Sequence, residues 1–192
     1  MSIVVGFHDL LVRAAAGNPH APALTYRDET VTYAALSAEV GSLAAHLSSR
    51  GLERGDRVAI YLEKRVETVA VMFATSAAGA VFVPINHVLK PSQVSHILGD
   101  SGATWLVTSP ERLSQLSAAL ADTAVTDVLV VGDRPDIDGP RIHDWPSQGG
   151  PHARPVAAVD CDPVAILYTS GSTGRPKGVV LTHRHLAAEV AG

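Results

Sequence analysis

Short apolar runs that alternate with amphipathic stretches between residues 58 and 132 limit this chain to one class of fold. The apolar runs end at glycine, proline or polar residues, which predicts strands at 58–62, 81–85, 104–108 and 127–132. Between them, apolar side chains recur every three or four residues, as on the buried face of a helix. Because strands that alternate with helices form parallel βαβ units, the sequence predicts an α/β fold with a doubly wound, mostly parallel sheet flanked by helices.

A helix, a hairpin and a second helix are expected before this alternation begins. Residues 7–16 have apolar side chains on one helical face and stop at a Gly-Asn-Pro turn. Residues 23–26 and 30–32 flank a charged turn and predict a hairpin. The second helix is predicted by an apolar stripe at steps of four, three and four residues, formed by Leu36, Val40, Leu43 and Leu47.

Residues 133–163 differ in composition from the rest, because six of the twelve prolines of the chain fall there. Such a stretch predicts a long surface connection. Ile142 and Trp145 are the side chains expected to hold it against the protein. The apolar run that follows needs a sheet to join, so we expect no domain boundary here and a single unit over residues 1–192.

The polar stretch Tyr168–Gly178 lies between two apolar runs, 164–167 and 179–181. This order predicts a strand, a glycine-rich loop, a second strand and a helix that begins near Thr182. Glycines let successive main-chain N–H groups turn toward an anion, hydroxyls add donors, and a lysine adds a positive charge. The loop therefore predicts a polyphosphate site, with the candidate residues Thr169, Ser170, Gly171, Ser172, Thr173, Gly174 and Lys177.

The spacing excludes three better-known glycine-rich loops. A Walker loop would need a glycine where Pro176 stands and a hydroxyl residue where Gly178 stands. A dinucleotide-binding loop needs a single residue between its first two glycines, and a nucleophile elbow needs one residue between its first glycine and the serine. In this chain two residues, Ser172 and Thr173, separate the first two glycines, which excludes the dinucleotide-binding loop. Ser172 follows Gly171 directly, which excludes the nucleophile elbow.

The stretch from Thr169 to Gly178 closely resembles the phosphate loop of the AMP-forming adenylate enzymes: acyl-CoA synthetases, luciferases and peptide-synthetase adenylation domains. Residues 78–86, together with residues 89–101, also resemble this family and look most like its acyl-CoA synthetase branch, since peptide synthetases commonly have aspartate where Asn86 stands. The resemblance runs from about Phe7 to the last residue. It implies the amino-terminal portion of the large domain, with the rest of that domain and a carboxyl-terminal domain absent.

The resemblance also implies a two-step ligase reaction, with fatty-acid metabolism among its settings. A carboxylic acid would react with ATP and Mg²⁺ to give an acyl-adenylate, which passes to the thiol of CoA or of carrier-protein phosphopantetheine. The seven candidate loop residues would hold the ATP phosphates and the pyrophosphate. No catalytic residue and no metal ligand is implied in this portion, so the chain alone is expected to be inactive. The alternative is a non-catalytic nucleotide- or partner-binding module that reuses the fold.

Composition and termini narrow the setting. A net charge of −4 and a pI near 6.1 argue against a general binder of nucleic acid or of membrane surfaces. No signal peptide is evident, and no apolar run approaches the ~18 residues that cross a membrane. A single cysteine excludes an internal disulfide framework and suits a reducing compartment. We therefore expect a soluble, cytoplasmic protein.

Three reactive side chains are predicted to have structural roles. His183 and His185 stand two apart, point in different directions and are expected at the surface or as helix caps. Cys161 is expected to be a small packing residue. Leu186 and the alanines beside it are expected to need a partner face that the sequence does not supply.

Overall fold

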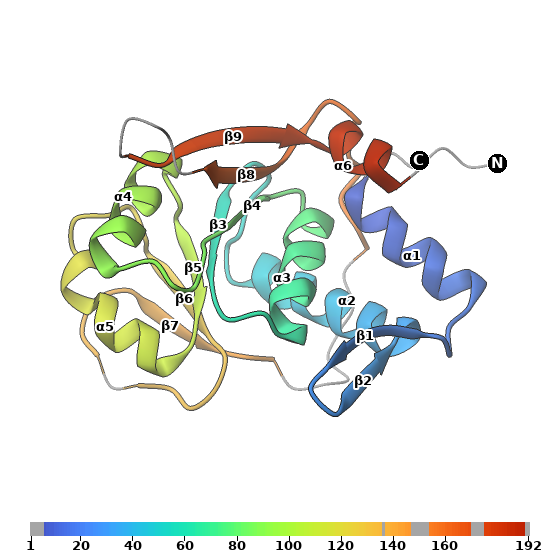
Figure 1. The fold of residues 1–192 in the computed structure, drawn as a ribbon, viewed down its shortest axis with the longest axis horizontal. Helices are drawn as coiled ribbons and strands as arrows, with labels where there is room; N and C mark the ends of the chain where they lie inside the picture. Colours follow the sequence, from blue (N-terminus) through green and yellow to red (C-terminus); the bar gives the residue numbers. More distant parts are fainter. Residues whose placement is uncertain (1–5, 136, 147–153, 170–174, 191–192) are drawn as a thin grey trace.

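The computed structural model describes residues 6–135, 137–146, 154–169 and 175–190, and its main feature is a seven-stranded sheet with the order β7-β6-β5-β3-β4-β8-β9 (Figure 1). The neighbouring strands pair in parallel, except that β9 runs antiparallel to β8. This confirms the predicted mostly parallel sheet. The strands are β3 (Arg57–Tyr61), β4 (Val81–Pro84), β5 (Trp105–Thr108), β6 (Asp127–Val130), β7 (Arg141–Asp144), β8 (Pro163–Thr169) and β9 (Lys177–Thr182).

Helices cover both faces of this sheet, as the doubly wound prediction requires. On one face α1 (Phe7–Gly17), α2 (Tyr33–Ser49) and α3 (Val66–Ala77) pack against Val58 and Ile60. On the other face α4 (Pro91–Ser101) and α5 (Pro110–Leu120) pack against Ala59 and Tyr61. Successive side chains of β3 thus enter opposite cores, which is why its sequence is apolar from Val58 to Tyr61.

The segment before the sheet folds as predicted. A separate hairpin pairs β1 (Pro22–Tyr26) with β2 (Glu29–Thr32) in antiparallel fashion. Helix α2 follows directly, and the Thr32 hydroxyl caps it by accepting the backbone N–H of Ala35 at 3.2 Å.

The connection at 133–163 contains a strand that the sequence does not predict. β7 adds to the far edge of the sheet in parallel with β6, and Asp127 opposes Arg141. Ile142 is buried and Trp145 packs against the first core, so these two side chains hold the segment as expected. The interpretation of the whole stretch as a surface connection is therefore wrong for residues 141–144.

Helix α6 (His183–Val190) packs on α1, which corrects the expectation that it lacks a partner face. Leu186 contacts the first core, and the Phe7 N–H donates to His183 Nδ1 at 2.8 Å. His183 is buried, so its predicted surface position is wrong, and burial lowers the pKa of its ring. His185 stays exposed and accepts the Thr182 N–H at 3.1 Å, which confirms a capping role.

Two further expectations concern Cys161 and membrane-spanning helices. Cys161 is exposed, so its predicted packing role is wrong. Across the described parts of the chain, no helix has the length and apolar character needed to cross a membrane.

Candidate functional site: the edge hairpin

The last two strands form a hairpin at the edge of the sheet, and the glycine-rich loop connects them. β8 joins the sheet by pairing with β4 at Phe82 and Ala165. β9 pairs with β8, with Thr169 directly opposite Lys177 at the open end. The predicted order of strand, loop, strand and helix is confirmed.

Of the predicted phosphate-binding residues, the structure places Thr169 and Lys177 side by side. Ser170, Gly171, Ser172, Thr173 and Gly174 lie outside the described residues. Paired residues share one face of a hairpin, so Thr169 and Lys177 lie on the same side of it. Both are exposed, and no ion pair ties the Lys177 ammonium to another described residue. A hydroxyl and an ammonium group therefore stand together, open to an anion.

Tyr168 anchors the same end of the hairpin to α4. Its hydroxyl donates to Asp100 Oδ2 at 2.5 Å. Burial raises the pKa of the Tyr168 phenol, and the hydrogen bond to the Asp100 carboxylate raises it further, so the hydroxyl stays a neutral donor. The sequence does not predict either residue for the site. The only signal was the position of Tyr168 directly before the loop.

Gly178 makes room for the Tyr168 ring. A Cβ at this position would lie 2.9 Å from Ile166 Cγ2 and 3.1 Å from Tyr168 Cζ. Because Tyr168 and Gly178 are directly opposite in the hairpin, the ring leans across the glycine backbone. The glycine after the lysine thus has a packing role, and the candidate phosphate-binding set leaves it out.

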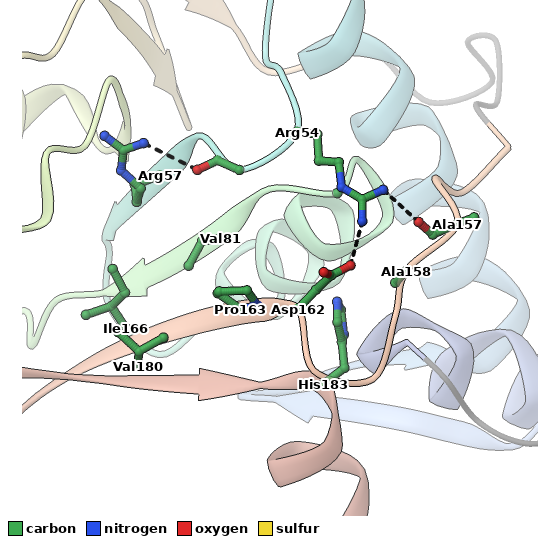
Figure 2. A pocket seen from close by; sticks show the side chains of 12 residues that line it. Arg54, Arg57, Val81, Ala157, Ala158, Asp162, Pro163, Ile166, Val180 and His183 are labelled. Carbon is green, nitrogen blue, oxygen red and sulfur yellow. Dashed lines mark hydrogen bonds and ion pairs between the residues drawn. The ribbon is translucent and has the colours of Figure 1, made fainter.

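A cavity of about 290 Å³ lies under the face of the hairpin that carries Ile166 and Val180, opposite to the face of Lys177 (Figure 2). Its guanidinium groups already bond to protein groups: Arg54 pairs with Asp162 at 2.6 Å, and Arg57 donates to backbone carbonyls of residues 55, 101 and 102. Ile166 and Val180 line the cavity, and side chains alternate along a strand. Lys177 therefore points away from this cavity, which we interpret as a joint between the hairpin and the sheet.

No group of three or more histidine, cysteine, aspartate or glutamate side chains is placed to hold a metal ion within the described ranges. His8 and His183, which come together beside α1, have their rings edge to face with centroids 6.2 Å apart. His8 Nδ1 lies 3.0 Å from the Ser76 hydroxyl. These buried rings join α1 to its neighbours, and they lie outside the candidate phosphate-binding set.

The fold and its edge hairpin define an α/β protein with a glycine-rich loop at the end of a mostly parallel sheet. Residues 11–192 match the family described as AMP-binding enzyme, and the chain belongs to that family. The predicted resemblance is confirmed at this level.

Relatives with different names match this chain over most of its length. Feruloyl-CoA synthase of Amycolatopsis sp is 39% identical over 175 residues, which cover 91% of this chain and 33% of that protein. Surfactin synthase subunit 3 of Bacillus subtilis (strain 168) is 35% identical over 174 residues, covering 90% of this chain and 12% of that protein. This chain thus spans about a third of the first relative.

A solved structure shows the same fold. A long-chain-fatty-acid-CoA ligase from Archaeoglobus fulgidus superposes with a TM-score of 0.84 at 25% sequence identity. The match covers 100% of this chain and 39% of that chain. The described arrangement of sheet and helices is therefore shared with the large domain of adenylate-forming enzymes.

Proposed function

We propose that this chain is the phosphate-loop portion of an ATP-dependent, AMP-forming acid–thiol ligase. In the first step a carboxylate oxygen attacks the α-phosphorus of ATP, an O–P bond forms, and the bond to the leaving pyrophosphate breaks. In the second step a thiolate attacks the acyl carbonyl of the adenylate, and AMP leaves with the electron pair of the broken bond. The activity itself belongs to the intact protein of which this chain would form a part.

The observation that carries the proposal is the exposed Lys177 beside Thr169, at the two ends of the glycine-rich loop, with no ion pair from Lys177 to any residue that the structure describes. In the proposed site these two residues and Ser170–Gly174 bind the β- and γ-phosphates. Their donors stabilise the pyrophosphate as its negative charge grows, an effect that preorganised groups supply without rearrangement. Phosphoryl transfer depends mainly on such positioning and charge neutralisation.

Only the hydroxyl oxygens of this donor set suit Mg²⁺ as ligands. The loop offers hydroxyl oxygens, N–H groups and one ammonium, and magnesium prefers oxygen ligands and keeps several waters. The hydroxyls of Thr169, Ser170, Ser172 and Thr173 are the side chains that could reach it. When bound, the ion would neutralise negative charge on the phosphates.

For the thiol acceptor we favour CoA. Relatives with CoA-ligase names include feruloyl-CoA synthase and sulfoacetate–CoA ligase, at 39% and 34% identity. Asn86, where peptide synthetases commonly carry aspartate, points the same way; its Oδ1 accepts the Val88 N–H at 3.2 Å. A carrier-protein thiol is the second option, because a surfactin synthase subunit is 35% identical. The proposed location is the cytoplasm.

The experiment is carboxylate-dependent ATP–pyrophosphate exchange by the intact protein. Lys177→Ala is expected to lower the exchange rate by about 10²–10³-fold, as loss of one preorganised charge contact does. Arg134→Ala removes an exposed positive charge near β6 and β7, at the far edge of the sheet, and should leave exchange unchanged.

Two outcomes would contradict the proposal. Equal exchange in wild type and Lys177→Ala would remove the role of the lysine. ATP binding without exchange, across aliphatic, aromatic and amino acids, would favour the non-catalytic module instead.

A further inference from the structure

The open end of the hairpin, residues 166–169 and 177–180, is a two-stranded ribbon that projects past its pairing with the sheet (Figure 1). The register between β4 and β8 is the single pair Phe82 and Ala165. β4 ends two residues later at Pro84, which has no N–H to donate to a neighbouring strand. A two-stranded ribbon is marginally stable by itself. Its tip therefore needs another support.

Tyr168 supplies that support. Its hydroxyl donates a hydrogen bond to another element, at 2.5 Å to Asp100 Oδ2 in the last turn of α4. The ring also packs against the second core, which α4 and α5 share. Helix α4 is held in turn by the buried Val94, Ile97 and Leu98. The ribbon is thus fixed to a rigid part of the molecule.

The anchor acts next to the phosphate-binding groups. Tyr168 directly precedes Thr169, and Gly178, over which the ring leans, directly follows Lys177. Because side chains alternate along a strand, the anchor holds one face of the ribbon while Thr169 and Lys177 point from the other. Holding the ring in place therefore fixes the direction in which Lys177 leaves the ribbon.

We propose that Tyr168 and Asp100 are a positioning pair for the phosphate loop: their hydrogen bond holds the ribbon so that Lys177 meets the phosphates of ATP. The proposal rests on the proposed ligase function. Neither residue touches the reacting atoms in this scheme. Asp100 acts only as an acceptor, so a neutral amide oxygen at the same place can replace it.

The first test is the KM for MgATP in pyrophosphate exchange by the intact protein. Tyr168→Phe keeps the ring and removes the donor, and should raise this KM about 3- to 10-fold, because a lost hydrogen bond to a charged group displaces the lysine. Asp100→Ala should give the same increase, and the double variant should be no worse than either single variant. Asp100→Asn keeps an acceptor oxygen, so its KM for MgATP should stay near that of wild type. The KM for the acid should change little in all of them.

The control is Tyr61→Phe. Tyr61 is more deeply buried and donates its hydroxyl to the Leu89 carbonyl at 2.8 Å, away from the ribbon. Its loss should lower the melting temperature at least as much as Tyr168→Phe does, without raising the KM for MgATP. A KM increase in Tyr61→Phe equal to that in Tyr168→Phe would show a general stability effect and overturn the pair.

The second test does not need turnover. Amide hydrogen exchange of residues 177–180 should become faster in Tyr168→Phe and in Asp100→Ala, and should match wild type in Asp100→Asn. Unchanged amide hydrogen exchange of residues 177–180 in Tyr168→Phe overturns the positioning pair, whether or not the protein adenylates an acid. Faster amide hydrogen exchange together with an unchanged KM for MgATP also overturns the positioning pair, since the contact is then structural only. Failure of the ligase proposal is seen separately, as absence of pyrophosphate exchange in the wild type.

Discussion

At the residue scale, the space over Gly178 determines how the tyrosine ring lies against the hairpin. The Tyr168 ring and the Ile166 methyl group occupy the place that a Cβ would take. Isoleucine is branched at Cβ and has few rotamers to move into, so it cannot easily give way. A larger side chain at 178 therefore disturbs both the ring and the strand next to it.

Gly178→Ala is expected to lower the free energy of unfolding by about 1–2 kcal/mol, the usual cost of inserting a methyl group into filled space. Urea unfolding of the purified protein measures it. The matched control is Gly99→Ala in α4, where nothing lies within 4 Å of the added Cβ. That variant should gain about 0.5–1 kcal/mol, because alanine favours a helix over glycine. If Gly178→Ala is as stable as wild type, the packing role of this glycine is wrong.

The residue scale also separates what a sequence reveals about a site from what it hides. Lys177 and Thr169 could be predicted because a lysine and hydroxyls among glycines suit phosphate wherever the loop lies. Asp100 could not, because it stands 68 positions from Tyr168 and its partner is set by the path of the hairpin over α4. Cys161 and His183 show the same limit, since burial depends on which elements meet.

At the scale of elements, a buried carboxylate fastens β7 to the sheet. Asp127 begins β6, its side chain is 3% exposed, and its oxygens accept Arg141 Nη2–H at 2.7 Å and His143 Nε2–H at 2.8 Å. The Thr126 hydroxyl donates to it at 2.8 Å. The His143 ring also stacks on Trp105, with centroids 5.0 Å apart. Two residues of β7 are thereby held by one residue of β6.

Asp127→Asn is expected to destabilise the protein by about 1–3 kcal/mol at pH 7, the cost of disturbing a buried, charge-assisted network. The expected loss is no larger because the Arg141 side chain is 71% exposed, so solvent screens its attraction to the Asp127 carboxylate. Urea midpoints of wild type and variant measure the loss. Asp122→Asn, at an exposed position after α5, is the control and should change little.

The destabilisation caused by Asp127→Asn is expected to depend on pH. Burial alone would raise the pKa of Asp127, but hydrogen bonds from Arg141, His143 and Thr126 outweigh it and hold the pKa below its usual 3.8. A carboxyl whose pKa is lower in the folded state stabilises the fold above the unfolded pKa and loses that contribution as pH falls through the folded pKa. The difference between wild type and Asp127→Asn should therefore be full at pH 6–7 and shrink below about pH 4. An equal difference at pH 7 and pH 3 would contradict this account.

The elements themselves were predictable where they carry their own pattern. β3, β4, β5 and β6 each contain a continuous apolar run buried on both faces, at 58–61, 81–83, 105–107 and 128–130, so their sequences suffice. β7 has one apolar residue, Ile142, among Arg141, His143 and Asp144, and becomes a strand because Asp127 binds two of its side chains. Propensity cannot reveal a strand that depends on a distant carboxylate. The α1–α6 contact was hidden for the same reason, since 176 positions separate Phe7 from His183.

At the scale of the whole molecule, the two edges of the sheet differ. The β7 edge strand is held to β6 by the Asp127 network, whereas the β9 edge strand exposes Val179 and Val180 by 48% and 53%. These neighbours point to opposite faces, so both faces of β9 are open. The proposed phosphate loop ends at this strand, at Lys177. Within the described residues, β9 has a neighbouring strand on its β8 side only.

The 192-residue chain alone is expected not to adenylate any acid. Its proposed contacts reach only the phosphate end of ATP, and water around an open edge weakens each charge–charge contact, by several-fold between a partly buried site and bulk solvent. The measurement is pyrophosphate exchange by the purified chain with aliphatic, aromatic and amino acids, beside a full-length adenylate-forming enzyme as positive control. The Lys177→Ala chain is purified and assayed in parallel. Exchange from a contaminating enzyme would be the same in both preparations, whereas genuine turnover would fall in the variant. Robust exchange that disappears in Lys177→Ala would show that the edge hairpin, with the sheet behind it, suffices for the chemistry.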